Sequence, residues 1–141
     1  MSLDEKDKKI ISILLENARL PFTDIAKKLG ITDVAVKKRL KKLEKNGVIK
    51  KYTVIVDPSK LGYQDVALVG VDTEPDKILE VAEKLSEKEY SRFVYLTTGD
   101  HMIMVEIWAK NNTDLMKIIK EIGSLPGVKK VCPAIILDQI K

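Results

Sequence analysis

Positively charged side chains in residues 33–46 have the type and density needed to bind a polyanion. The segment carries Lys37, Lys38, Arg39, Lys41, Lys42 and Lys45 against only Asp33 and Glu44. Lysines bind phosphate oxygens, whereas an arginine can also bind a base edge. In residues 75–88 and 113–122 the positive and negative side chains nearly balance, so the excess is specific to 33–46. The alternative interpretation is a solvated, lysine-rich helix surface.

The charge distribution along the chain points to the same end. Residues 1–50 hold 13 Lys and Arg against 7 Asp and Glu, whereas residues 51–141 hold 12 against 14. The net charge of +4 is therefore the difference between a basic first part and a slightly acidic second part. A basic excess confined to one part of a chain favours nucleic acid as the partner of that part.

Three predicted helices would position these side chains. Apolar residues recur with helical spacing over 3–17, 22–29 and 33–46. Gly30 suits the end of the second helix and Thr32 the N-cap of the third, which leaves a three-residue turn between them. This is helix-turn-helix geometry, in which the last helix enters the major groove of DNA. The residues expected to contact DNA are Thr32, Asp33, Ala35, Lys37, Lys38, Arg39 and Lys42.

A β-branched segment, residues 48–56, follows the third helix and predicts a strand or a short β wing. The turn-forming residues 57–62 then indicate a linker. We therefore expect three parts: a helix-turn-helix domain over 1–50, a wing and linker over 51–64, and a second domain over 65–141.

The second domain shows a strand-helix-strand pattern twice. Strands are predicted over 66–73, 92–98, 101–109 and 128–137, helices over 75–88 and 113–122, and a two-residue hairpin turn at Gly99-Asp100. This order is that of a ferredoxin-like βαββαβ fold. The expected fold class is α+β, an N-terminal winged helix-turn-helix joined to this domain. The strands are apolar on both faces, so we expect two copies to pack through the face without helices as a two-fold dimer.

Few residues could support catalysis. His101 is the only histidine and Cys132 the only cysteine, and no glycine-rich phosphate loop occurs. We therefore expect no enzyme activity, no cofactor and no metal. Without a long apolar run, no signal peptide or membrane contact is expected, and the single cysteine suits a cytoplasmic location. The second domain also lacks the aromatic motif of an RNA-recognition sheet.

Six segments occur with the order and spacing of one known family. They are Leu3 to Asp7, Asn17-Ala18-Arg19, Ile25 to Ile31, Val36 to Ile49, Asp57 to Gly62 and Gly99-Asp100-His101. Together they resemble the Lrp/AsnC (feast/famine, leucine-responsive) transcription regulators over nearly the whole chain. The resemblance implies double-stranded DNA as a partner, a homodimer and a higher oligomer, an octamer. The chain departs at Thr32-Asp33-Val34-Ala35, where many relatives have a Ser-Pro cap, so the base preference stays open.

The resemblance also implies a small amino-acid effector in the second domain, at Thr98, Gly99, Asp100 and His101. Asp100 could accept its ammonium group, and Gly99 lets the backbone approach its carboxylate; an ordinary hairpin turn is the alternative. We predict a sequence-specific DNA-binding regulator whose assembly or DNA binding responds to the effector. Two other functions stay open: an architectural DNA-coating protein and a metabolite-sensing module acting on a protein partner.

Overall fold

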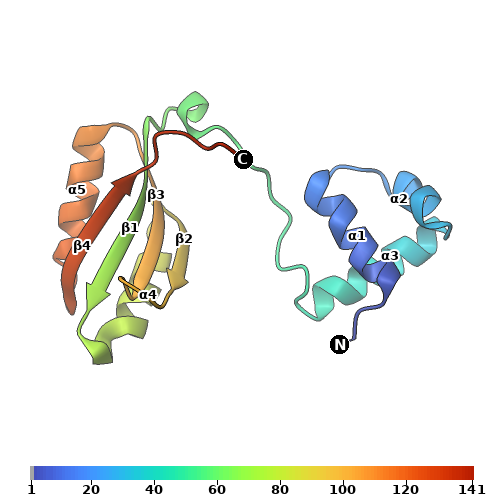
Figure 1. Cartoon of the computed structure of the whole chain (residues 1–141), viewed down its shortest axis with the longest axis horizontal. Helices are drawn as coiled ribbons and strands as arrows, with labels where there is room; N and C mark the ends of the chain where they lie inside the picture. The colour runs from blue at the N-terminus through green and yellow to red at the C-terminus, as the bar shows by residue number, and fades with distance from the viewer. Residues whose placement is uncertain (1) are drawn as a thin grey trace. The chain divides into compact units, whose positions relative to one another are not determined.

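The computed structural model describes residues 2–141, which divide into two compact units between residues 55 and 56 (Figure 1). The first unit contains three helices: α1 (Glu5–Glu16), α2 (Phe22–Leu29) and α3 (Asp33–Lys45). All three contribute to one apolar core, and their fully or nearly fully buried residues are Ile10, Ile25, Ala26, Val36, Leu40 and Leu43. The spacing of these residues is helical, which is why the helices could be predicted from the sequence.

The expected β wing is absent, and that prediction was wrong. None of the described residues from 48 to 56 forms a strand. A wing needs a second strand to accept its hydrogen bonds, and the first unit offers none. Ile49 packs on the helical core instead, the Tyr52 hydroxyl donates to Glu44 Oε1 at 2.8 Å, and Val54 and Ile55 are exposed. The segment is therefore an extended connection held near its start.

The second unit is a four-stranded antiparallel sheet with two helices. After a 3₁₀ turn, η1 (Pro58–Leu61), its elements are β1 (Asp65–Thr73), η2 (Pro75–Lys77), α4 (Ile78–Ser86), β2 (Ser91–Leu96), β3 (Ile103–Ala109), α5 (Asn112–Gly123) and β4 (Val128–Ile135). The strand order is β2-β3-β1-β4, so the two central strands are β1 and β3. This is the ferredoxin-like arrangement that the sequence predicted.

Both helices cover the same face of this sheet. Alternate residues of β1 and β3, including Val69 and Val105, share one core with Val81 and Leu85 of α4 and Ile122 of α5. We call the opposite face the open face. It carries side chains of all four strands, and its larger apolar members are Val66, Leu68, Phe93, Tyr95, Met104 and Trp108. Several of them are at least two-fifths exposed in this chain, as the apolar alternation predicted.

The connection between β2 and β3 is longer than predicted. The Thr97 amide donates to the Met102 carbonyl at 3.0 Å, which encloses a four-residue loop, 98–101, rather than a two-residue turn. We call residues 98–101 the β2–β3 loop. Two contacts explain the extra length: Thr97 Oγ1 donates to the His101 carbonyl, and Asp72 accepts the Met102 amide at 3.2 Å. These bonds replace the sheet pairing that a tighter turn would have had.

Candidate nucleic-acid interface and effector site

The turn between α2 and α3 has the capping chemistry that a helix-turn-helix needs. Gly30 ends α2 with φ of 66°, a left-handed conformation that glycine adopts without strain. Thr32 Oγ1 then accepts the Ala35 amide at 3.1 Å and caps α3. These two residues fix the angle at which α3 leaves the turn, so α3 starts at Asp33 as the sequence predicted.

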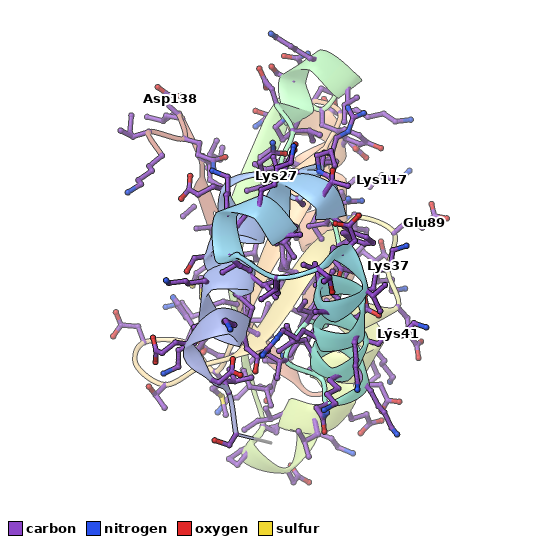
Figure 2. All side chains as sticks on the ribbon, turned by 90° about the vertical axis from the view of Figure 1, so that its right-hand side faces the viewer. Lys27, Lys37, Lys41, Glu89, Lys117 and Asp138 are labelled. Atoms are coloured by element: carbon purple, nitrogen blue, oxygen red, sulfur yellow. The ribbon has the colours of Figure 1, made fainter. Side chains whose placement is uncertain are left out.

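One side of α3 is buried and the opposite side is exposed to solvent. Val36, Leu40 and Leu43 face the core. On the outer side, positions i, i+4, i+7 and i+11 form a single row, which we call the α3 stripe: Val34, Lys38, Lys41 and Lys45. All four are exposed, and Figure 2 shows Lys41 and its neighbour Lys37 projecting outward from α3. Within residues 2–141, no lysine of α3 forms a salt bridge.

The predicted DNA-contacting residues are not equivalent in the structure. Lys38 and Lys42 are exposed on the outer side, and so is Asp33 at the start of the helix. Lys37 lies toward α2, with its Nζ 5.8 Å from the centroid of the Phe22 ring. Ala35 is half-buried. Val34, Lys41 and Lys45 were not among the predicted site residues, although counting helical turns outward from the buried Leu40 would have identified them.

Arg39 is engaged within the protein, contrary to its predicted place on the outward face. Its Nη1 donates to Asp4 Oδ2 at 2.7 Å and to Asp7 Oδ1 at 2.9 Å. Both carboxylates belong to the capping box of α1, and the Asp7 side chain is only 8% exposed. The Arg39 guanidinium and the Asp7 amide lower the pKa of Asp4, and the two carboxylates raise the pKa of Arg39. Arg39 therefore fastens α3 to α1.

The predicted effector residues also separate into two groups. Thr98, Gly99 and Asp100 are exposed at the tip of the β2–β3 loop, and Gly99 has φ of 99°. His101 instead turns back onto the open face, where its ring lies over Gly70 of β1 and its Nδ1 is 3.1 Å from Asp72 Oδ2. The tip remains accessible to a ligand, whereas His101 positions the loop on the sheet.

Two cavities lie in the second unit, and the sequence predicted neither. One, of about 610 Å³, is lined mostly by apolar residues on both sides of the β2–β3 loop and at the start of α4: Pro75, Asp76, Ile78, Leu79, Leu96, Thr97 and Met102. It lies next to the predicted effector residues and could hold an apolar side chain of a ligand whose charged groups bind the loop.

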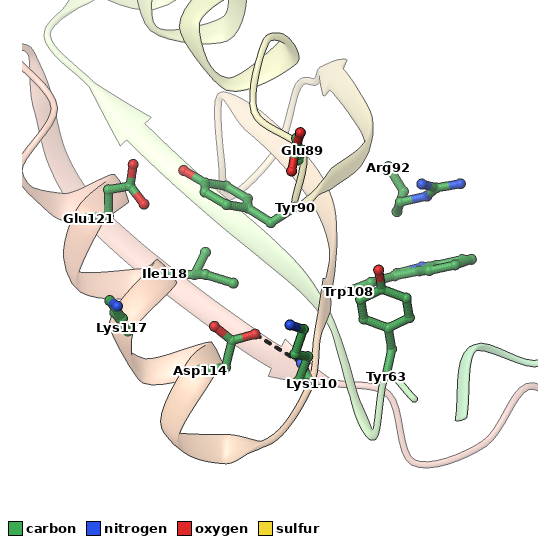
Figure 3. A pocket seen from close by; sticks show the side chains of 10 residues that line it. All are labelled: Tyr63, Glu89, Tyr90, Arg92, Trp108, Lys110, Asp114, Lys117, Ile118 and Glu121. Carbon is green, nitrogen blue, oxygen red and sulfur yellow. Dashed lines mark hydrogen bonds between the residues drawn. The ribbon is translucent and has the colours of Figure 1, made fainter. Parts of the chain in front are cut away.

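The other cavity, of about 300 Å³, lies between the beginning of β2, the end of β3 and α5 (Figure 3). The Arg92 guanidinium stacks 4.3 Å from the centroid of the Trp108 ring, and Tyr63 packs at 5.5 Å from the same ring. Burial and the nearby Glu121 carboxylate raise the pKa of Tyr90 from its ordinary value of 10.0 to about 12. Three positive and three negative side chains line the cavity, so it favours neither ionic sign of ligand.

Other kinds of site are not formed by the described residues. Residues 2–141 contain no group of three or more His, Cys, Asp or Glu side chains placed to hold a metal ion. No helix in this part of the chain is long and apolar enough to span a membrane.

Known proteins match both units. Residues 3–50 match the family model for winged helix-turn-helix DNA-binding domains, and residues 66–141 match the model for the Lrp/AsnC ligand binding domain. The HTH-type transcriptional regulator LrpA of Pyrococcus horikoshii is 56% identical over 140 residues, which cover 99% of each chain. The crystal structure of PH0061 is 30% identical, has a TM-score of 0.90 and covers 100% of this chain and 97% of its own.

A more distant structure shares the fold. The complex of the transcriptional regulator NMB0573 of Neisseria meningitidis with L-Met is 21% identical, has a TM-score of 0.87 and covers 99% of this chain and 93% of its own. The matched domains are a DNA-binding and a regulatory ligand-binding domain, and the relatives are transcriptional regulators, which confirms the prediction of a protein that is not an enzyme. The chain belongs to the Lrp/AsnC family of transcription regulators.

Proposed function

We propose that this regulator binds a pseudo-palindromic DNA site as a dimer and that a small amino acid changes this binding. The observation that carries the proposal is the α3 stripe, whose lysines are exposed and form no salt bridge within residues 2–141. A helix-turn-helix presents such a row to the major groove, where lysines bind phosphates and release counterions. Two copies related by a two-fold axis would bind half-sites about 10 base pairs apart, or a multiple of that.

The dimer would form through the open face. Its exposed apolar side chains are Leu68 of β1 and Phe93 and Tyr95 of β2, and such a surface is costly to leave in water. A two-fold axis through the open face places identical residues opposite one another, as a homodimer requires. Association of these dimers into an octamer is the assembly that the family resemblance implies. Binding of this protein to chromosomal DNA agrees with the cytoplasmic location expected for it.

The effector would bind at the tip of the β2–β3 loop. The Asp100 carboxylate is exposed and can accept an ammonium group, and backbone amides near Gly99 can bind a carboxylate. The neighbouring 610 Å³ cavity is large enough for an apolar side chain. The NMB0573 complex with L-Met gives a precedent for such a ligand in a protein of the same fold. The effector would shift the assembly or the spacing of the DNA-binding units, with a coupling of about 1–3 kcal/mol.

The test is a DNA titration with the full chain. The DNA upstream of its own gene is compared with competitor DNA at two salt concentrations, with and without a panel of free amino acids. Preferential binding that one amino acid alters, and that Asp100→Ala makes insensitive to it, supports the proposal. Salt-sensitive binding without sequence preference or amino-acid response supports an architectural role instead. A Lys38→Glu variant that binds DNA as well as the wild type would favour a module that acts on a protein partner.

A further inference from the structure

Val34 is an apolar residue that is exposed to solvent near the start of α3. It is the second residue of α3 and its side chain is 74% exposed. Single exposed apolar residues are common on protein surfaces. However, valine is a weaker helix former than alanine or lysine, and this side chain adds nothing to the core. Its position is therefore not explained by the stability of the first unit.

The geometry of α3 gives Val34 the same direction as the lysines. Val34 is the first member of the α3 stripe, one turn before Lys38 and two before Lys41. If those lysines face DNA, Val34 faces it as well. The N-terminal residues of a recognition helix are the ones that contact base edges, so Val34 would lie where the helix approaches the floor of the major groove.

The residues beside Val34 have less freedom to read bases. The Thr32 hydroxyl is used to cap the Ala35 amide at 3.1 Å, and Ala35 itself is half-buried. Asp33 is exposed, but its carboxylate repels phosphates and accepts hydrogen bonds only from a base amino group such as that of cytosine. Val34 is thus the only side chain of the first turn of α3, residues 33–36, that is both exposed and uncharged.

Only one group on the floor of the major groove is apolar, the C5 methyl of thymine. A valine placed against the polar edges of other bases would remove water from them without replacing their hydrogen bonds, which costs free energy. We propose that Val34 is a specificity-determining residue that contacts a thymine methyl and selects an A·T pair in each half-site. This inference rests on the proposed sequence-specific binding and adds to it the chemistry of one base position.

The experiment removes the methyl group from the DNA and the isopropyl group from the protein. Sites are first selected from random DNA with the full chain, and each thymine is then replaced singly by uracil, which lacks the C5 methyl. With the wild type, one replacement in each half-site should weaken binding about three- to fivefold, as burial of one methyl group predicts. With Val34→Ala, the same replacement should have little effect. Because alanine is the better helix former, loss of folding does not confound this variant.

The control is Lys38→Ala, one turn along the α3 stripe. It should weaken binding to every sequence and keep the wild-type response to uracil, because a lysine–phosphate contact carries no base information. If selection yields preferred sites but wild type and Val34→Ala respond alike at every thymine, the inference about Val34 is overturned while the proposed function stands. If no preferred site emerges, sequence-specific binding itself fails, and the inference fails with it.

Discussion

At the scale of single residues, we expect Arg39 to contribute to the stability of the first unit and its neighbour Lys38 to contribute to DNA binding. Arg39 bonds to Asp4 and Asp7, and removing it would leave the nearly buried Asp7 carboxylate without its positive partner. We expect Arg39→Ala to lower the free energy of unfolding by about 2 kcal/mol, as measured by denaturant titration. Lys38→Ala, the matched control, should leave the unfolding free energy nearly unchanged and weaken DNA binding. If Arg39→Ala leaves the free energy of unfolding unchanged but weakens DNA binding as much as Lys38→Ala does, then Arg39 contacts DNA.

The sequence could not separate these two residues, because the partners of Arg39 lie more than thirty positions away in the chain. The spacing of Val36, Leu40 and Leu43 fixes which side of α3 is buried, and it correctly predicted an exposed Lys38. Arg39 lies at the border of the buried side, where tertiary contacts determine whether its side chain is solvated or forms an ion pair. Charge density alone therefore gave a set of candidate DNA contacts on α3 that included one residue with partners inside the protein.

The pH dependence of stability offers a second test at this scale. Arg39 lowers the pKa of Asp4 in the folded protein, so the unfolded chain binds the proton more readily. The resulting stability is present above the ordinary aspartate pKa of about 3.9 and is lost as the pH falls through the lowered value. Asp4→Asn should therefore show a smaller change in denaturation midpoint between about pH 5 and pH 2 than the wild type. Asp33→Asn is the control, because Asp33 is exposed and forms no salt bridge within residues 2–141. An Asp4→Asn profile parallel to that of the wild type would contradict the assignment.

At the scale of elements, the β2–β3 loop depends on a glycine in a neighbouring strand. The His101 ring occupies the space where a side chain at Gly70 would project, and His101 is held there by Asp72. Gly70→Ala should destabilise the protein by about 1–3 kcal/mol through this overlap. In a His101→Ala background the same change should cost little, because the ring is gone. A double-mutant cycle by thermal or chemical denaturation measures the difference, and equal costs in both backgrounds would show that the overlap is relieved elsewhere.

Most elements could be predicted because their hydrophobic period is a local property. The helices of the first unit and the alternation in β1 and β3 follow from the residues that enter the two cores. The wing was wrong because β-branched residues favour extended backbone but do not supply a partner strand. The β2–β3 loop was longer than predicted because Asp72, about thirty residues earlier, accepts the Met102 amide and draws His101 onto the sheet. Both errors concern contacts between distant segments.

The lysines of the α3 stripe allow a test of phosphate binding by the helix as a whole, through the salt dependence of DNA binding. If its lysines bind phosphates, replacing one with alanine should reduce the slope of log binding constant against log salt concentration by about 1. Lys41→Ala is the sharpest variant, since Lys41 is exposed in the middle of the stripe. Lys84→Ala on α4 is the matched control, because Lys84 pairs with Glu80 in a helix of balanced charge. Equal slopes for the two variants would show that α3 does not bind the phosphate backbone.

At the scale of the whole molecule, DNA affinity is expected to depend on the open face. Leu68 lies in the central strand β1 and is 41% exposed there, opposite Glu106 of β3 and Ala134 of β4. A lysine at this position would remain in water in a monomer, so the second unit should fold normally. In the proposed dimer the same charge would be buried against its symmetry mate, which costs several kcal/mol and should prevent association.

Leu68→Lys should therefore sediment as a monomer. It should also bind DNA that carries two half-sites about a hundredfold more weakly, because a single chain contacts only one half-site and the gain from linking two helix-turn-helix units is lost. Its affinity for a single half-site should stay that of the wild-type unit, which distinguishes loss of the dimer from damage to α3. Met116→Lys is the control, since Met116 is 46% exposed on α5, away from the open face, and should leave the dimer intact. A Leu68→Lys protein that remains dimeric would place the dimer contact on another surface. The paired half-sites would then have to be explained by a different two-fold axis.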